Sequence, residues 1–109
     1  MAQTYKNLAQ LAPSPALLTL AYVVPPTASA SVNSFVVANR GAVPARYRIS
    51  VALNGAADAL KQYLAYDVSL KEHITASLTL GVHLVAGDEV RVYDELGAIT
   101  FNLFGSETL

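Results

Sequence analysis

Three of the chain's four arginines lie within nine residues, at Arg40, Arg46 and Arg48. A guanidinium group donates paired hydrogen bonds to a carboxylate or a phosphate, so this cluster can hold an anion or fix an ion pair between two protein surfaces. Arg46 and Arg48 fall on one face of an alternating strand, and Arg40 precedes Gly41 in a turn. Pairing within the fold, a contact between subunits and ligand binding all stay open as interpretations. The candidate carboxylate partners are Asp67, Asp88, Asp94 and Glu107.

The two histidines are the only strong nitrogen ligands for a metal ion in this chain, which has no cysteine. His73 and His83 lie on either side of Gly81, and the nearest acids in the sequence are Glu72 and Asp88. A metal site needs three or four ligands that converge on one point. We therefore predict no metal site and no cofactor.

Catalytic patterns are also missing from the sequence. Without cysteine there is no thiol nucleophile, and neither a glycine-rich phosphate loop nor a Gly-x-Ser-x-Gly motif occurs. Carboxylates are adjacent only in Asp88-Glu89 and Asp94-Glu95, and neighbouring residues of a strand point to opposite faces. We predict that the chain is not an enzyme and has no catalytic residue.

Tyrosine is the commonest aromatic residue, with six copies. Exposed tyrosines beside basic residues can form a platform on which bases or sugars stack. The alternative is that these rings bridge the core and the rim of a β-sandwich, which we favour because the net charge of −1 gives no general attraction for nucleic acid. The tyrosines are Tyr5, Tyr22, Tyr47, Tyr63, Tyr66 and Tyr93, and their basic neighbours include Arg46, Arg48, Lys61 and Arg91.

The composition is apolar for so short a chain. Hydrophobic residues make up 53% of the 109 residues and charged residues 14%, against about 25% charged in an ordinary soluble domain. A small domain has much surface for its volume, so we expect part of this surface to meet other protein. The alternative is a surface built from Ala, Ser, Thr and Asn. No run of about twenty apolar residues offers a membrane span, and we predict neither a membrane nor a nucleic-acid partner.

Apolar and polar residues alternate with a period of two along most of the chain, which is typical of antiparallel strands with one buried face. Short turn signals rich in Gly, Pro, Asn and Asp separate these stretches. We predict an all-β, antiparallel two-sheet β-sandwich of Ig-like or jelly-roll type with seven to eight strands. Residues 1–15 are predicted to be an extended N-terminal arm and residues 16–109 a single β-sandwich domain. The expected strands are residues 17–24, 31–39, 45–53, 62–68, 73–80, 89–93 and 98–104, with an eighth at 7–12 and one helical turn within 56–60.

Six segments of the chain resemble, in their order along the sequence, small structural proteins of tailed bacteriophages. The similarity covers roughly residues 17–107, and the most distinctive phrases are Asn-Arg-Gly at 39–41 and Phe-Asn-Leu-Phe-Gly-Ser-Glu at 101–107. The chain departs from the usual Pro-Ala-Gly turn, because it has Pro-Pro-Thr at 25–27. The segments are SFVVANRG at 34–41, YRISV at 47–51, YLAYDV at 63–68, LTLGV at 78–82, AGDEVRVY at 86–93 and TFNLFGSE at 100–107.

The resemblance implies a non-enzymatic virion component that decorates the capsid or joins head and tail parts, and it supplies no catalytic residues. We expect a capsid decoration or cement protein, a homotrimer that binds the major capsid protein or tail proteins, made in the cytoplasm of the bacterial host and located in the virion, on the capsid exterior or the tail. The alternatives are a tail, baseplate or fibre-adaptor protein, and a carbohydrate-binding module for host attachment. The expected interface residues are Arg40, Arg46 and Arg48 for ion pairs, with Tyr5 and Leu8 as anchors of the arm.

Overall fold

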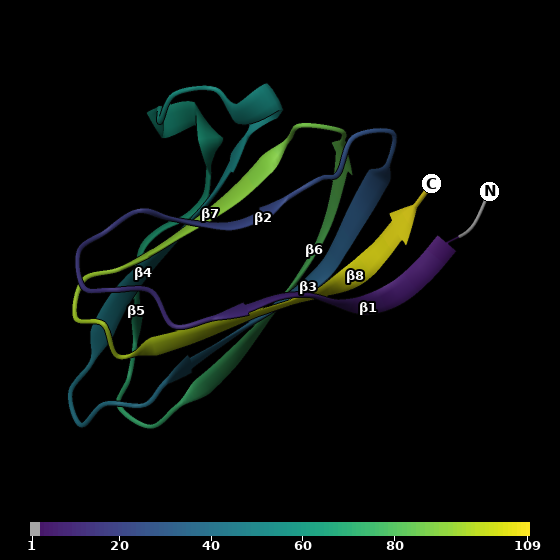
Figure 1. Cartoon of the computed structure of the whole chain (residues 1–109). Coiled ribbons are helices and arrows are strands. Elements are labelled where there is room, and N and C mark those ends of the chain that lie inside the picture. Colours follow the sequence, from purple (N-terminus) through teal and green to yellow (C-terminus); the bar gives the residue numbers. More distant parts are fainter. Residues whose placement is uncertain (1–2) are drawn as a thin grey trace.

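The alternating segments form eight antiparallel strands in two packed sheets in the computed structural model, which describes residues 3–109 (Figure 1). This arrangement confirms the predicted all-β two-sheet sandwich. Sheet A has the order β1 (Gln3–Leu11), β8 (Ile99–Thr108), β3 (Ser29–Asn39), β6 (Thr75–Val85). Sheet B has the order β2 (Thr19–Val23), β7 (Glu89–Asp94), β4 (Ala45–Ala52), β5 (Tyr63–Leu70).

The strand pairing distinguishes between the two predicted topologies. β1 pairs with β8 and β3 with β6 in sheet A, while β2 pairs with β7 and β4 with β5 in sheet B. This is the order of an eight-stranded jelly roll, in which the two ends of the chain lie side by side. Figure 1 shows β1 and β8 next to each other, close to the N- and C-terminal labels.

Several element boundaries differ from those expected. Of the residues assigned to the N-terminal arm, Gln3–Leu11 form the edge strand β1, which pairs with β8, and residues 1 and 2 lie outside the described part of the chain. β6 begins at Thr75 because His73 lies in the preceding turn with a φ of 55°. β8 continues to Thr108, well past residue 104. In place of one helical turn within residues 56–60, two 3-10 turns flank that connection, at Leu53–Gly55 and Leu60–Gln62.

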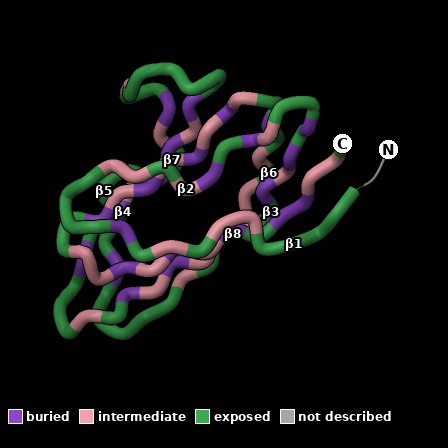
Figure 2. Tube along the Cα trace, viewed as in Figure 1, coloured by how far each residue is buried: buried purple, intermediate pink, exposed green. Residues whose placement is uncertain are grey.

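The core lies between the sheets and consists of the inward-facing side chains of the central strands. Figure 2 shows buried residues concentrated along β3, β4, β7 and β8. Tyr47 of β4 meets Phe101 of β8 edge to face, with ring centroids 6.1 Å apart. The largest of the other fully buried side chains are Phe35, Ile49, Ile99 and Leu103.

A close approach of two backbones fixes the position of Gly105 in β8. The ladder between β3 and β8 shifts register between Val32 and Ser34, and Val32 pairs with Gly105. A Cβ atom at Gly105 would lie 1.9 Å from the carbonyl oxygen of Ser31. Only glycine therefore lets β3 and β8 stay paired through this irregularity.

Two buried aspartates hold the turns at either end of β7. Asp88 accepts hydrogen bonds from the backbone N–H groups of Asn54 (2.8 Å) and Val85 (3.0 Å). Asp94, which has no exposed surface, accepts hydrogen bonds from the N–H groups of Leu96 (3.1 Å) and Ile99 (2.7 Å). Neither carboxylate pairs with an arginine, because both accept hydrogen bonds from backbone N–H groups instead.

Candidate functional site

The strongest gathering of interaction-prone side chains lies on the outer face of sheet B. Arg48 of β4 has its guanidinium carbon 4.2 Å from the ring centroid of Tyr66 in β5 and 4.5 Å from that of Tyr93 in β7. Arg48 faces outward because it alternates with Tyr47 and Ile49, which point into the core. Both ring contacts are cation–π interactions.

Arg48 also pairs with Asp67, one of the four carboxylates proposed as partners. Its Nε lies 2.6 Å and its Nη2 3.3 Å from the two carboxylate oxygens, so the pair is bidentate. The hydrogen bond from Arg48 lowers the pKa of Asp67 and raises that of Arg48. Asp67 has a φ of 52° at an irregularity in the ladder between β4 and β5. Pairing within the fold is therefore shown for Arg48.

A third tyrosine extends this group, which we call the arginine–tyrosine cluster: Arg48, Asp67, Tyr63, Tyr66 and Tyr93. Tyr63 meets Tyr66 edge to face with centroids 5.0 Å apart, and its hydroxyl donates a hydrogen bond of 2.8 Å to Asp58. Burial and then the bond to Asp58 raise the pKa of Tyr63. Tyr66 remains 48% exposed. Arginine and tyrosine are enriched in protein interfaces, and these side chains are already held in place.

The other two predicted arginines do not join the cluster's ion pair. Arg46 is exposed on the same strand and forms no ion pair within residues 3–109. Arg40 donates a hydrogen bond of 3.0 Å from its guanidinium to the carbonyl of Gly97, which ties the turn after β3 to the turn before β8. The three arginines thus have three different environments, although the sequence places them close together.

The two predicted anchors of the N-terminal segment, Tyr5 and Leu8, differ in their exposure to solvent. Leu8 is partly buried and packs against the core, whereas Tyr5 is 72% exposed. Tyr5 lines a depression of about 520 Å³ on sheet A together with Asn33 and Phe104.

A polar group that we did not predict joins the two ends of the chain to sheet B. Lys6 of β1 pairs with Glu107 of β8 at 2.6 Å, and the hydroxyl of Tyr22 in β2 donates a hydrogen bond to the same carboxylate. The bond from Lys6, followed by that from Tyr22, lowers the pKa of Glu107. Burial and the neighbouring carboxylate raise the pKa of Tyr22. No local pattern signals this group, because its members come together only when the jelly roll closes.

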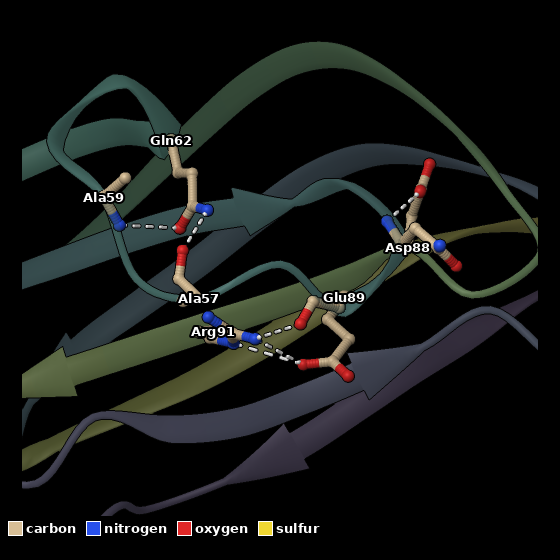
Figure 3. A network of polar contacts seen from close by, with 8 residues as sticks. Ala57, Ala59, Gln62, Asp88, Glu89 and Arg91 are labelled. Atoms are coloured by element: carbon tan, nitrogen blue, oxygen red, sulfur yellow. Dashed lines mark hydrogen bonds and ion pairs between the residues drawn. The ribbon is translucent and has the colours of Figure 1, made fainter.

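The connection between β4 and β5, residues 53–62, is held by internal hydrogen bonds, and we call it the apolar loop. Gln62 donates a hydrogen bond of 2.8 Å to the carbonyl of Ala57 and accepts one of 3.3 Å from the N–H of Ala59 (Figure 3). The loop nevertheless exposes Leu53 (66%) and Leu60 (78%). A cavity of about 330 Å³ lies beside it, lined by Val51, Leu53, Ala56, Lys61 and Gln62.

Arg91 of the neighbouring strand β7 contacts this loop. Arg91 pairs with Glu89 at 3.0 Å (Figure 3). Its guanidinium also donates a longer hydrogen bond of 3.4 Å to the carbonyl of Gly55. Apolar side chains displayed on a braced loop lose little conformational freedom when they bind a partner. The apolar loop is therefore a second interaction-prone surface, separate from the arginine–tyrosine cluster.

No metal-binding arrangement occurs in the part of the chain that the structure describes. His, Asp and Glu side chains within residues 3–109 form no group of three that could hold an ion, and His83 hydrogen-bonds to Ser31 (2.8 Å). No helix within the same residues is long and apolar enough to cross a membrane. Comparison of the chain with family models, curated proteins and solved structures finds no match.

Proposed function

We propose that this chain is a non-enzymatic structural protein of a virion, most specifically a decoration protein that binds the outside of a capsid and bridges neighbouring capsid subunits. The observation that carries the proposal is the charge distribution of sheet A. Its four strands contain only two charged residues, Lys6 and Glu107, and these pair with each other. An outer sheet face without free charge is typical of the centre of a protein interface.

Sheet B provides the contrast within the same molecule. Its outer face carries Arg46, Arg48, Asp67, Glu89 and Arg91, whereas Asp94 of β7 is buried. In an assembly, the uncharged face of sheet A would lie against a neighbouring subunit, while the more polar face of sheet B would meet solvent or the rim of a contact. Each Å² of apolar surface removed from water contributes about 25 cal/mol.

Two further observations support the proposal. Six segments of the chain are similar to those expected in small structural proteins of tailed bacteriophages, and jelly rolls are common in viral capsid domains. A fold alone does not decide function, since lectin domains use jelly rolls as well. The proposed assembly is a homotrimer on the major capsid protein, with Arg46 available for an ion pair across a subunit boundary.

The carbohydrate-binding alternative depends on exposed aromatic faces. A sugar platform needs a free ring face, but Arg48 covers a face of both Tyr66 and Tyr93. Tyr63 is already engaged with Tyr66 and Asp58. The cluster therefore favours a protein contact over a glycan, and we rank the attachment module below the structural roles.

The proposal is tested by adding the purified protein to phage particles that lack it, produced from a phage genome in which its gene has been deleted. We expect saturable binding, in a number comparable to that of the major capsid protein, and greater resistance of the particles to heating. Binding confined to one small ring would instead support the tail or baseplate role. No binding, with particles equally stable with and without the protein, would refute both structural roles.

Matched variants locate the binding face. Phe104→Lys adds a charge to the outer face of sheet A, where Phe104 is exposed, and we expect it to reduce binding at least tenfold. Val43→Lys adds the same charge at an exposed position in the turn between β3 and β4 and serves as the control. Equal binding by both variants and the unmodified chain would contradict the assignment of sheet A as the contact face.

A further inference from the structure

All three ladders of sheet A are interrupted at the same level of the sheet. The ladder between β1 and β8 skips Leu8, and the ladder between β3 and β8 skips Asn33. Both skipped residues flank one step of β8, Phe104–Gly105, and the ladder between β3 and β6 also shifts beside Asn33. Bulges are over-represented next to active sites, because an extra residue changes the direction in which side chains point.

The depression on sheet A lies at these bulges. Its volume is about 520 Å³, within the range of about 300–1,000 Å³ that is usual for small-molecule sites. Neighbouring residues of a regular strand point to opposite faces, whereas Asn33 and Ser34 both line the depression. The extra residue in β3 makes this possible. The side chains that line the depression are Tyr5, Lys6, Asn7, Asn33, Ser34 and Phe104.

Two aromatic side chains, Tyr5 and Phe104, border this depression. Tyr5 is 72% exposed and Phe104 is 40% exposed. Neither ring takes part in the aromatic pairs or the cation–π contacts found within residues 3–109. They differ in this from Tyr66 and Tyr93, which Arg48 covers. An exposed ring face is a surface on which the flat, apolar side of a ligand can stack.

Amide groups supply polar partners beside the rings. Asn33 is exposed, and its side chain offers one acceptor and two N–H donors. Asn7 is held in place, because its side-chain oxygen accepts the N–H of Ala9 at 3.0 Å and its Nδ2 donates to Asn102 at 3.3 Å. Groups that both donate and accept hydrogen bonds suit the hydroxyls of a ligand, which do the same.

The absence of an unpaired charge in this lining narrows the class of ligand. Its one cationic side chain, that of Lys6, is paired with Glu107 at 2.6 Å. Nucleic acid depends on cationic side chains for much of its affinity, so this depression does not suit it. An acyl chain would leave the amides without hydrogen-bond partners, which is costly.

We propose that this depression binds a neutral sugar unit of an oligosaccharide. A sugar ring has C–H groups on its faces, which would pack against Tyr5 and Phe104, and hydroxyls around its rim, which would hydrogen-bond to Asn7 and Asn33. The lining comes from β1, β3 and β8, so the outer surface of β6 stays outside the site. The inference goes beyond the proposed function, since it concerns a ligand of the single chain and does not depend on a capsid.

The class of ligand is tested on an array of immobilised oligosaccharides. Neutral chains of hexoses and N-acetylhexosamines are compared with sialylated and sulfated chains. We expect binding to a neutral oligosaccharide and no gain from acidic groups, because the lining has no unpaired cation. Binding to acidic oligosaccharides alone, or to no oligosaccharide, would overturn the proposal.

The position of the site is tested by NMR titration of the neutral oligosaccharide that binds on the array, up to millimolar concentration. The side-chain amide signals of Asn7 and Asn33 should shift, whereas that of Gln62, in the apolar loop, should not. Tyr5→Ala should weaken binding about tenfold, as expected when one stacking ring is removed. Tyr66→Ala is the same change on sheet B and should leave binding unchanged. Loss of binding in Tyr66→Ala but not in Tyr5→Ala would overturn the assignment to sheet A.

A second variant tests the hydrogen bonds without removing a ring. Asn33→Ala removes an amide from the depression, and Gln10→Ala removes an exposed amide of β1 outside its lining as the matched control. We expect weaker binding by Asn33→Ala and wild-type binding by Gln10→Ala, with the NMR spectrum of a folded chain for both. Equal affinities of the wild type and both folded variants would contradict the proposed site.

These outcomes are separable from those of the capsid experiment. A chain that binds particles but no neutral oligosaccharide would refute the sugar site and leave the proposed function intact. A chain that binds a neutral oligosaccharide through Tyr5 but binds no particles would do the reverse.

Discussion

The substitution Gly105→Ala tests the close approach of β3 and β8 at the centre of sheet A. The new Cβ would lie 1.9 Å from the carbonyl oxygen of Ser31 and 3.0 Å from the Cα of Val32. Both are backbone atoms, so no side-chain rotation can relieve the clash and the two strands must separate. Overpacking costs about 1–3 kcal/mol, and we expect the upper part of that range because the obstacle is backbone.

The matched control is Gly81→Ala in β6, where the added methyl group meets nothing within 4 Å. Alanine restricts the unfolded chain more than glycine does, so this change should leave stability unchanged or raise it by about 0.4–1 kcal/mol. Both variants are compared with the wild type by urea denaturation at a low concentration where the chain is monomeric.

A fall in the urea midpoint for Gly105→Ala, with the slope unchanged, is the expected result. For a domain of this size the loss corresponds to a decrease in Tm of about 4–8 °C per kcal/mol. If Gly105→Ala unfolds at the same urea concentration as Gly81→Ala, the pairing of Val32 with Gly105 is wrong and so is the register of sheet A.

The remaining predictions concern three polar groups. Asp94→Ala leaves the buried N–H of Ile99 and the partly buried N–H of Leu96 without their acceptor and should cost about 1–3 kcal/mol in urea denaturation, whereas the exposed Glu95→Ala should cost less than about 0.5 kcal/mol; equal losses would contradict the turn-holding role. Arg48→Lys removes the bidentate bond and the planar stack, and should cost about 1 kcal/mol; an unchanged thermal midpoint would show that the cluster does not stabilise the fold. The ion pair and the tyrosine bond hold the pKa of Glu107 below its ordinary value of 4.5, so they stabilise the folded chain above that pH and the contribution is lost as the pH falls through the lower, folded-state pKa. Glu107→Gln should therefore flatten the acid limb of a stability–pH profile measured by thermal unfolding; an acid limb as steep as that of the wild type would exclude Glu107 as its source.

The strands were predictable because their signal is local. Alternation places Tyr47 and Ile49 inward and Arg48 outward whatever the rest of the chain does. The end of β8 was missed because Gly105 is an ordinary turn signal in a sequence, and its actual role depends on the backbone of Ser31. The start of β6 was set too early because His73 adopts a left-handed turn conformation that a sequence pattern does not reveal.

The polar contacts were predictable only where they join strands that are neighbours in the chain. Asp67 was one of four candidate partners, and it pairs with Arg48 because β4 and β5 are adjacent. The other three candidates bind groups that no arginine pattern suggests. Asp94 accepts hydrogen bonds from N–H groups of its own turn, Asp88 accepts one from its own turn and one from Asn54 after β4, and Glu107 meets residues from the opposite end of the sequence.

The proposed interaction surfaces could not be located from the sequence. The low charge content predicted that some surface meets other protein, but it did not say which surface. The two sheets differ: the strands of sheet A contain only two charged residues, which pair with each other, whereas the strands of sheet B contain six. This asymmetry depends on which strands share a sheet, which is a property of jelly-roll topology and not of composition.

We propose that this chain is an assembly component that covers uncharged sheet surface against other protein, including copies of itself. Sedimentation velocity of the wild type over a hundredfold range of concentration tests the self-association most directly. We predict a weight-average sedimentation coefficient that rises with concentration toward a discrete oligomer. A single species of 11.5 kDa at every concentration would contradict the claim.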